Sequence, residues 1–197
     1  MGKLKLLYLP PAALSADILS DRAVQLLQSL GDVTWNELGR DLSPDELKAW
    51  LPGADAVVTS WGSPAFTADA MGVADKLRIV GHAAGTIKHM VSDEFWDKGA
   101  VVLSAAPEIA YSVAEYVIWA MLTMQRDLVR FDRKMKSGTP WRSAGDSWGH
   151  ELLHRKVGVV AASFVGRAVI AQLHAFHCDV SVYDPYLSDE AAKALGA

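Results

Sequence analysis

The stretch most suggestive of chemistry runs from Lys156 to Pro185, where an apolar run turns sharply into a helix-forming segment. Ala161, Ser163 and Gly166 stand where a nucleotide-binding turn needs small residues: for the turn itself, for the approach of a pyrophosphate, and for packing of the helix on the strand. Only the last position keeps a glycine. Because helix N-terminal N–H groups after such a turn can receive a phosphate, the stretch is predicted to bind a dinucleotide.

Asp184 follows at the tip of the next apolar run, about 20 residues further on. A carboxylate in this place is suited to accept hydrogen bonds from the adenosine ribose hydroxyls, which favours NAD over NADP. Arg167 lies inside the predicted helix and is not an obvious ligand for a 2′-phosphate. The expected cofactor is therefore NAD.

A second group with possible chemistry is His174, His177 and Cys178, whose spacing could suit a metal ion. A helix end with a single cysteine offers no clear fourth ligand, however. We expect no metal site here.

The elements that must position these residues begin with a repeated strand and helix pattern in the first half of the chain. Ser43-Pro44-Asp45-Glu46 is typical of a helix start, because a capping hydroxyl, a proline and two acidic residues agree. Alternation of short apolar strands with helices predicts a flavodoxin-like, doubly wound parallel sheet with helices on both faces. The expected strands are 4–9, 33–38, 56–60, 77–81 and 101–104, and the expected helices include 15–30, 67–74 and 92–98.

Pro107 marks a break, after which one long helix is expected from about 108 to 136, followed by a polar arm up to Gly149. The pattern then restarts with a strand at 157–161, a helix at 165–176, a strand at 180–183 and a helix capped by Ser188. We therefore predict two domains: residues 1–107, and residues 108–197 with the first βαβ unit of an incomplete Rossmann domain.

The composition of the chain argues against several classes of partner and location. A net charge of −4 and a pI near 5.8, without basic runs, favour neither nucleic acid nor an anionic membrane as a partner. The longest apolar helix candidate, 113–124, is too short to span a bilayer, and Pro10 and Pro11 interrupt the apolar N-terminal stretch that resembles a signal peptide. The single cysteine cannot form an internal disulfide, so a cytoplasmic location is expected.

Taken as a set, these motifs resemble the D-isomer-specific 2-hydroxyacid dehydrogenases over almost the full length. The resemblance is carried by LRIVGHAAGT (77–86), SAAPEIAYSVAEYVIWAML (104–122), Trp141, ELLHRKVGVVAASFVGRAV (151–169) and VYDPYL (182–187). It implies two domains with a cleft between them, the first serving the substrate and the second holding NAD.

Carried over position by position, the resemblance implies that Phe164 and Val165 offer backbone N–H groups to the pyrophosphate and that Asp184 holds the ribose. The substrate carboxylate is expected on backbone N–H groups of the loop that contains His82, Ala83, Ala84 and Gly85. Departures are visible at both places, since Ala84 and Thr86 stand where glycines are usual and Ala161 is unusual in the turn.

The family's chemistry uses an arginine, a carboxylate and a histidine. The resemblance places all three beyond residue 197, so no catalytic residue is expected within the chain, and His82 is not expected to be the proton shuttle. We expect a C-terminally truncated, inactive and poorly stable chain, with one face of the 108–136 helix and one sheet edge uncovered. The complete protein is expected to form a homodimer through the nucleotide domain and the arm near 126–150.

The leading interpretation is the N-terminal portion of an oxidoreductase that transfers hydride between NAD and a small D-2-hydroxy or 2-keto acid. Two alternatives stay open. One is a non-catalytic protein that keeps the dinucleotide fold as a sensor or a protein-interaction module, and the other is a decayed gene product.

Overall fold

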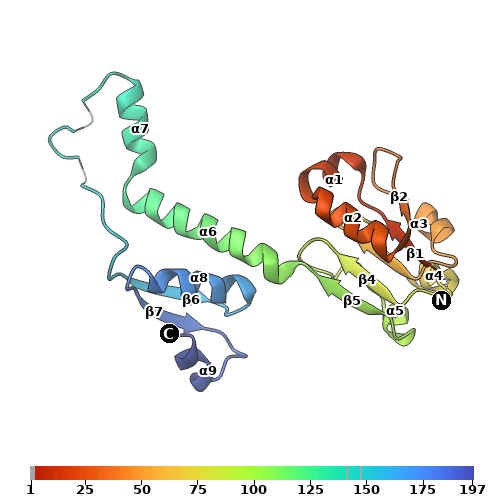
Figure 1. Ribbon diagram of the computed structural model, residues 1–197. Coiled ribbons are helices and arrows are strands. Elements are labelled where there is room, and N and C mark those ends of the chain that lie inside the picture. Colours follow the sequence, from red (N-terminus) through yellow and green to blue (C-terminus); the bar gives the residue numbers. More distant parts are fainter. Residues whose placement is uncertain (1–2, 141, 147) are drawn as a thin grey trace. The chain divides into compact units, whose positions relative to one another are not determined.

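The computed structural model describes residues 3–140, 142–146 and 148–197, so that Trp141 lies outside the described residues. The chain divides into two compact units between Ala106 and Pro107 (Figure 1). Each unit has its own hydrophobic core. The units are therefore described one at a time.

Unit 1 is built on a five-stranded sheet whose neighbouring strands all pair in parallel. The order β2-β1-β3-β4-β5 is that of a flavodoxin-like, doubly wound sheet, so the predicted fold class is confirmed. The strands are β1 (Leu4–Tyr8), β2 (Gly31–Trp35), β3 (Ala56–Thr59), β4 (Ile79–His82) and β5 (Val101–Ser104).

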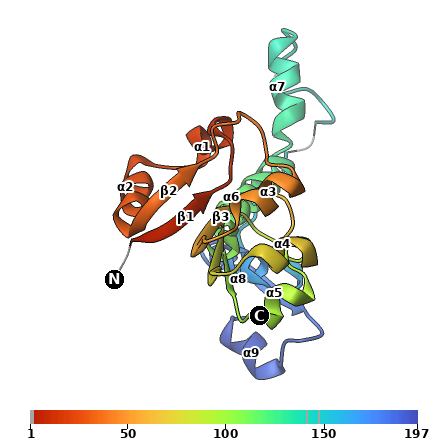
Figure 2. The same ribbon diagram turned by 90° about the vertical axis from the view of Figure 1, so that its right-hand side faces the viewer.

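Helices lie on both faces of this sheet, as Figure 2 shows: α1 and α2 on one side, and α3, α4 and α5 on the other. The main core forms on the second side, where Leu47, Met71 and Phe95 are fully buried against the sheet. The helices are α1 (Ala12–Ile18), α2 (Asp21–Leu30), α3 (Pro44–Trp50), α4 (Ala68–Val73) and α5 (Asp93–Asp97).

The single helix predicted at 15–30 is wrong, because the structure has two helices there. The backbone at Leu19 is extended, and the Ser20 side chain accepts a hydrogen bond from the amide of Ala23, which starts a second helix. Gly31 then opens β2, where a Cβ would lie 2.1 Å from the carbonyl oxygen of Leu4. Glycine is needed here for close strand pairing.

The helix start predicted at Ser43 is confirmed as a complete capping box. The Ser43 hydroxyl accepts from the Glu46 amide, and the Glu46 carboxylate accepts from the Ser43 amide at 2.7 Å. Arg40 also pairs with this carboxylate, and these bonds lower the pKa of Glu46 to about 2.

Unit 2 contains a two-stranded parallel sheet of β6 and β7, with α8 between them in sequence. Val169, Ile170 and Leu173 of α8 pack with Ala114 and Ile118 of α6 to form its core. The elements are α6 (Ala106–Gln125), α7 (Leu128–Lys136), β6 (Lys156–Val160), α8 (Phe164–His174), β7 (Asp179–Tyr183) and α9 (Asp189–Ala194).

The single long helix predicted at 108–136 is also wrong. The helix is interrupted at Asp127, whose φ of 52° lies in the left-handed region, and α7 starts immediately after it. The Asp127 carboxylate pairs with Arg130, which also donates to Asp146 of the arm at 2.6 Å. Lys134 adds a second bond to Asp146 at 2.5 Å, so ion pairs hold the arm against α7.

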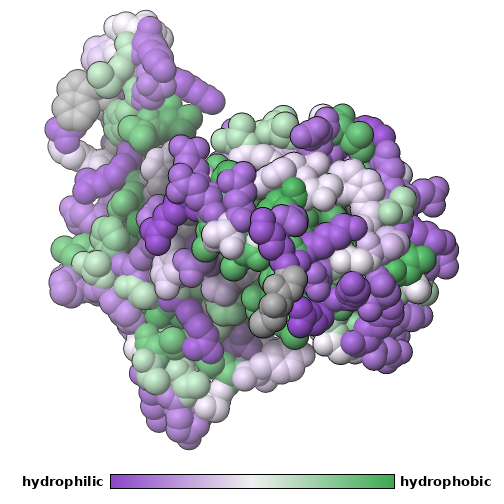
Figure 3. All heavy atoms as spheres, turned by 45° about the vertical axis from the view of Figure 1, so that its right-hand side comes forward, coloured by the Kyte–Doolittle hydropathy of each residue, from purple (hydrophilic) through white to green (hydrophobic). Residues whose placement is uncertain are grey.

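Several apolar side chains of unit 2 reach its surface. Leu128, Val129 and Met135 of α7 are exposed. Figure 3 shows hydrophobic side chains at the surface of this part of the molecule, at its upper left. Within the described residues β6 pairs only with β7, and a hollow of about 330 Å³ is lined by residues of α6, β6 and α8. Among the helices described, none is long and apolar enough to cross a membrane.

Candidate functional site

The turn after β6 brings together the residues that the sequence predicts for a dinucleotide. Ala161 leaves the strand with a φ of 74°, in the left-handed region that favours glycine, and its amide donates to the Tyr183 carbonyl at 2.8 Å. This is the position where the pattern expects the turn glycine. The chain therefore makes the tight turn with an alanine, at a conformational cost.

Gly166 lies on the first turn of α8, directly against Ala161. A Cβ at this position would stand 2.0 Å from the Ala161 carbonyl oxygen, too close for any side chain. The glycine thus lets α8 approach the turn, which is the packing role that the sequence pattern assigns to it.

The start of α8 presents free backbone donors. Ser163 is the N-cap residue, but its side chain makes no capping bond. The amides of Ser163, Phe164 and Val165 have no acceptor among the described residues, since the first bond of the helix runs from the Arg167 amide to the Ser163 carbonyl. These donors and the positive end of the helix dipole suit an anion.

Asp184 follows β7 and faces the same turn. One of its carboxylate oxygens accepts from the Tyr186 amide at 2.8 Å, and the other accepts from the Ala162 amide at 2.7 Å. These two bonds, with a smaller contribution from nearby Arg167, lower the pKa of Asp184. The carboxylate is therefore charged and fixed, and each oxygen keeps a further lone pair for a hydroxyl donor.

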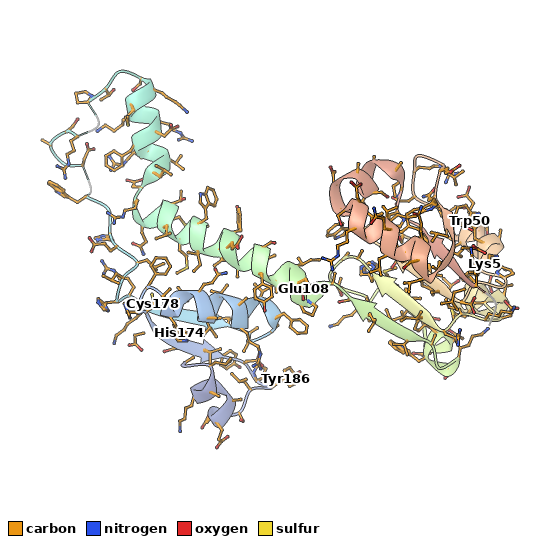
Figure 4. The ribbon with its side chains drawn as sticks, viewed as in Figure 1. Lys5, Trp50, Glu108, His174, Cys178 and Tyr186 are labelled. Atoms are coloured by element: carbon orange, nitrogen blue, oxygen red, sulfur yellow. The ribbon has the colours of Figure 1, made fainter. Side chains whose placement is uncertain are left out.

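Arg167 is close to this turn but is already engaged. Its Nε donates to the Ala162 carbonyl at 2.8 Å, which ties the helix to the turn. Tyr186, in contrast, is almost fully exposed and projects from the unit, as Figure 4 shows. The site thus offers amides and one carboxylate, and its outer side is open.

In unit 1, the loop after β4 contains the residues predicted for a substrate carboxylate. The His82 side chain is buried, and its Nδ1 lies 2.9 Å from the Thr59 hydroxyl. Burial lowers the pKa of His82, which favours the neutral ring. The ring faces the interior, so that any part of His82 in binding falls to its backbone.

The rest of this loop is anchored by hydrogen bonds to the end of β3, and its exposure increases from the buried Ala84 to the exposed Thr86. The Ala83 amide donates to the Thr59 carbonyl at 2.7 Å, and the Ser60 hydroxyl donates to the Ala83 carbonyl at 3.1 Å. The amides of Ala84, Gly85 and Thr86 have no acceptor within the described part of the chain. Successive free amides in a turn are suited to bind an anion, and here Gly85 and Thr86 are the accessible members while Ala84 is buried.

Sequence reasoning missed the two residues that hold this loop, Thr59 and Ser60. Both are buried at the carboxyl end of β3, next to β4 in the sheet. The available signal was a pair of polar residues at the end of an otherwise apolar strand, because buried hydroxyls need partners.

The three residues considered as metal ligands contact other groups of the protein instead. Figure 4 places His174 and Cys178 near the end of α8. His174 lies 2.8 Å from the Leu195 carbonyl, Cys178 donates to the Leu152 carbonyl, and His177 stacks on His154. Among the residues described, no group of three His, Cys, Asp or Glu side chains could hold a metal ion.

Comparison with known proteins agrees with this geometry. Residues 118–197 match the family model described as the NAD-binding domain of D-isomer-specific 2-hydroxyacid dehydrogenases. D-3-phosphoglycerate dehydrogenase of Methanocaldococcus jannaschii is 28% identical over 183 residues, covering 93% of this chain and 34% of the relative. The Mycobacterium bovis enzyme of that name is 31% identical over 186 residues, covering 94% and 34%. The chain thus spans about a third of the length of these relatives.

Solved structures show the same fold. A phosphoglycerate oxidoreductase from Rhizobium etli matches with a TM-score of 0.77 at 20% identity, covering 99% of this chain and 60% of that one. D-lactate dehydrogenase from Escherichia coli matches with a TM-score of 0.65 at 20% identity, covering 98% and 58%. The arrangement of strands and helices is therefore one that these dehydrogenases also have.

Proposed function

We propose that the chain is part of a D-isomer-specific 2-hydroxyacid dehydrogenase and forms the substrate unit and the first part of the NAD-binding unit of such an enzyme. NAD is the cofactor of the matched domain. The reaction would be hydride transfer between NAD and a small D-2-hydroxy or 2-keto acid.

The proposal rests on the position of the Asp184 carboxylate beside the β6–α8 turn, where it accepts a hydrogen bond from the Ala162 amide. Free amides at Ser163, Phe164 and Val165 suit a pyrophosphate, and Gly166 leaves no side chain between helix and turn. The fixed carboxylate of Asp184 stands beside the same turn, ready to accept from ribose hydroxyls. A dinucleotide needs these features together, so the residues present fit NAD.

The chemistry that NAD supplies when bound is acceptance of a hydride at its nicotinamide ring. The residues of unit 2 would hold its adenosine and pyrophosphate portion. In unit 1 the amides of Ala84, Gly85 and Thr86, steadied by Thr59 and Ser60, would orient the substrate carboxylate. His82, buried and biased toward its neutral form, would support this loop and exchange no proton with substrate.

Turnover would need the arginine, carboxylate and histidine that the family uses, which the resemblance places after position 197. The 197-residue polypeptide alone would therefore bind ligands without oxidising them. In the complete enzyme we propose a homodimer through α7 and the end of α6, where Met124, Leu128, Val129 and Met135 are exposed.

Calorimetric titration of the 197-residue chain with NAD and NADP tests the cofactor proposal. NAD should bind at least about tenfold more tightly than NADP, because Asp184 would face the 2′-phosphate. Asp184→Asn should shrink this ratio, while Asp179→Asn at the other end of β7 should leave it unchanged. Absence of NAD binding, or an equal affinity for NADP, would contradict the proposal.

A further inference from the structure

Unit 1 contains a pocket that shares no residue with the β6–α8 turn or with the loop after β4. Its volume is about 520 Å³, within the range of about 300–1,000 Å³ usual for small-molecule sites. Tyr8 of β1 and Trp35 of β2 contribute from the sheet, near the carboxyl ends of their strands. Ala12, Ser15, Ala16, Leu19, Val24 and Gln28 line it from the α1–α2 side.

The pocket exists because α1 and α2 cover the sheet loosely. Neither helix has a buried residue, and the residues that α1 contributes to the lining are small. Figure 1 shows this helix pair lying over β1 and β2. Because this hollow opens to solvent and its lining is mostly apolar, a bound molecule would displace water from apolar surface, which favours binding.

Tyr8 provides an independent indication of a ligand. It is only 1% exposed, and its hydroxyl has no hydrogen-bond partner among the described residues. A buried hydroxyl without a partner is costly and calls for an explanation. The centroid of its ring lies 4.8 Å from that of Trp35, so the two rings together form an aromatic wall of the pocket.

The other polar groups define what the pocket would accept. The Asn36 side chain is fully used, because it donates to the Leu9 and Arg40 carbonyls and accepts from the Leu38 amide. The Ser15 hydroxyl donates to the Pro11 carbonyl. Glu37 is the one charged residue of the lining that is described, and it is exposed at the rim, where it would repel an anion.

We propose that this pocket binds a small aromatic molecule, neutral or cationic, whose single buried hydrogen-bonding group pairs with the Tyr8 hydroxyl. The aromatic body would pack against Tyr8 and Trp35, and a positive group would lie toward Glu37. This site is additional to the proposed dehydrogenase function and does not depend on it.

The test uses three probes of similar size that differ in charge: p-cresol, tyramine and 4-hydroxyphenylacetate. Each probe is titrated into the 197-residue chain, and the indole N–H signal of Trp35 is followed by NMR. This signal is assigned beforehand as the one that is lost in the Trp35→Phe variant. The neutral and cationic probes should shift this signal saturably, and the anionic probe should bind more weakly. Tighter binding of the anion, or no shift with any probe, would overturn the proposal.

Two variants locate the contact. Tyr8→Phe keeps the ring but removes the hydroxyl and should weaken p-cresol binding about fivefold, the usual worth of one hydrogen bond. Tyr111→Phe, on the exposed surface of α6, is its matched control and should change nothing. Ala16→Phe should fill the pocket and abolish binding. Unchanged affinity in both Tyr8→Phe and Ala16→Phe would overturn the site.

Discussion

The carboxylate of Asp184 accepts a hydrogen bond from the Ala162 amide at 2.7 Å, which joins the end of β7 to the turn after β6. The second carboxylate oxygen is held by the Tyr186 amide. The group proposed to receive the ribose is thus also the group that fixes the geometry of the proposed phosphate turn. Cofactor preference and local stability should respond together when it is changed.

Protonation of Asp184 is expected to weaken the fold in acid. Its pKa is lowered in the folded chain, so its stabilising contribution is complete above the ordinary carboxyl pKa of about 3.9 and is lost as the pH falls through the lower folded value. Asp184→Asn should be less stable than wild type at neutral pH, and the gap should close in acid. Urea unfolding of both proteins from pH 7 to 2.5 measures it, and a constant gap would contradict the assignment.

Ala161→Gly should stabilise the chain by about 1 kcal/mol, because glycine adopts the left-handed backbone without the steric cost that alanine has there. Ala162→Gly is the matched control: Ala162 is not left-handed, and the change should destabilise by adding freedom to the unfolded chain. Both are read from urea unfolding. A loss of stability in Ala161→Gly would show that the turn is not strained.

Gly166→Ala should have the opposite effect, with a loss of about 1–3 kcal/mol, since its Cβ would overlap the Ala161 carbonyl oxygen. Gly158→Ala in β6 is the comparison, because a Cβ at Gly158 meets nothing within 4 Å. That variant should be neutral or slightly stabilising. Equal thermal denaturation curves for the two variants would count against close packing of α8 on the turn.

His82 predicts a second pH dependence, near neutrality. Burial lowers its pKa, so the folded chain binds its proton less readily than the unfolded chain. The stability is then complete above the unfolded pKa of about 6.5 and falls as the pH drops toward the folded value. His82→Asn should flatten the unfolding free energy between pH 7.5 and 5, whereas exposed His150→Asn should not. An unchanged slope would argue against a buried neutral ring.

The sequence allowed the sheet of unit 1 to be predicted, because short apolar strands alternate with capped helices. Its complete capping box at Ser43 involves only neighbours in sequence, and such local signals are readable. The ends of α1 and α6 could not be predicted in this way. At Asp127 a non-glycine residue takes the left-handed conformation while its carboxylate pairs with Arg130, and no glycine or proline marks the position.

The candidate site was predicted in part. Gly166 and Asp184 belong to a spacing pattern, so their positions were found from the sequence alone. That His82 faces inward depends on Thr59, which is 23 positions away and meets it only through the pairing of β3 with β4. Contacts between strands of this kind are not encoded in local spacing.

The start of α8 is proposed to receive the pyrophosphate of NAD. The most direct measurement is a ¹H–¹⁵N NMR titration of the labelled chain with NAD, followed at the backbone amides of Ser163, Phe164 and Val165. These three signals should shift saturably, and ADP-ribose, which lacks the nicotinamide, should shift them in the same way. If saturating NAD leaves them in place, or perturbs only amides elsewhere, the start of α8 does not receive the pyrophosphate.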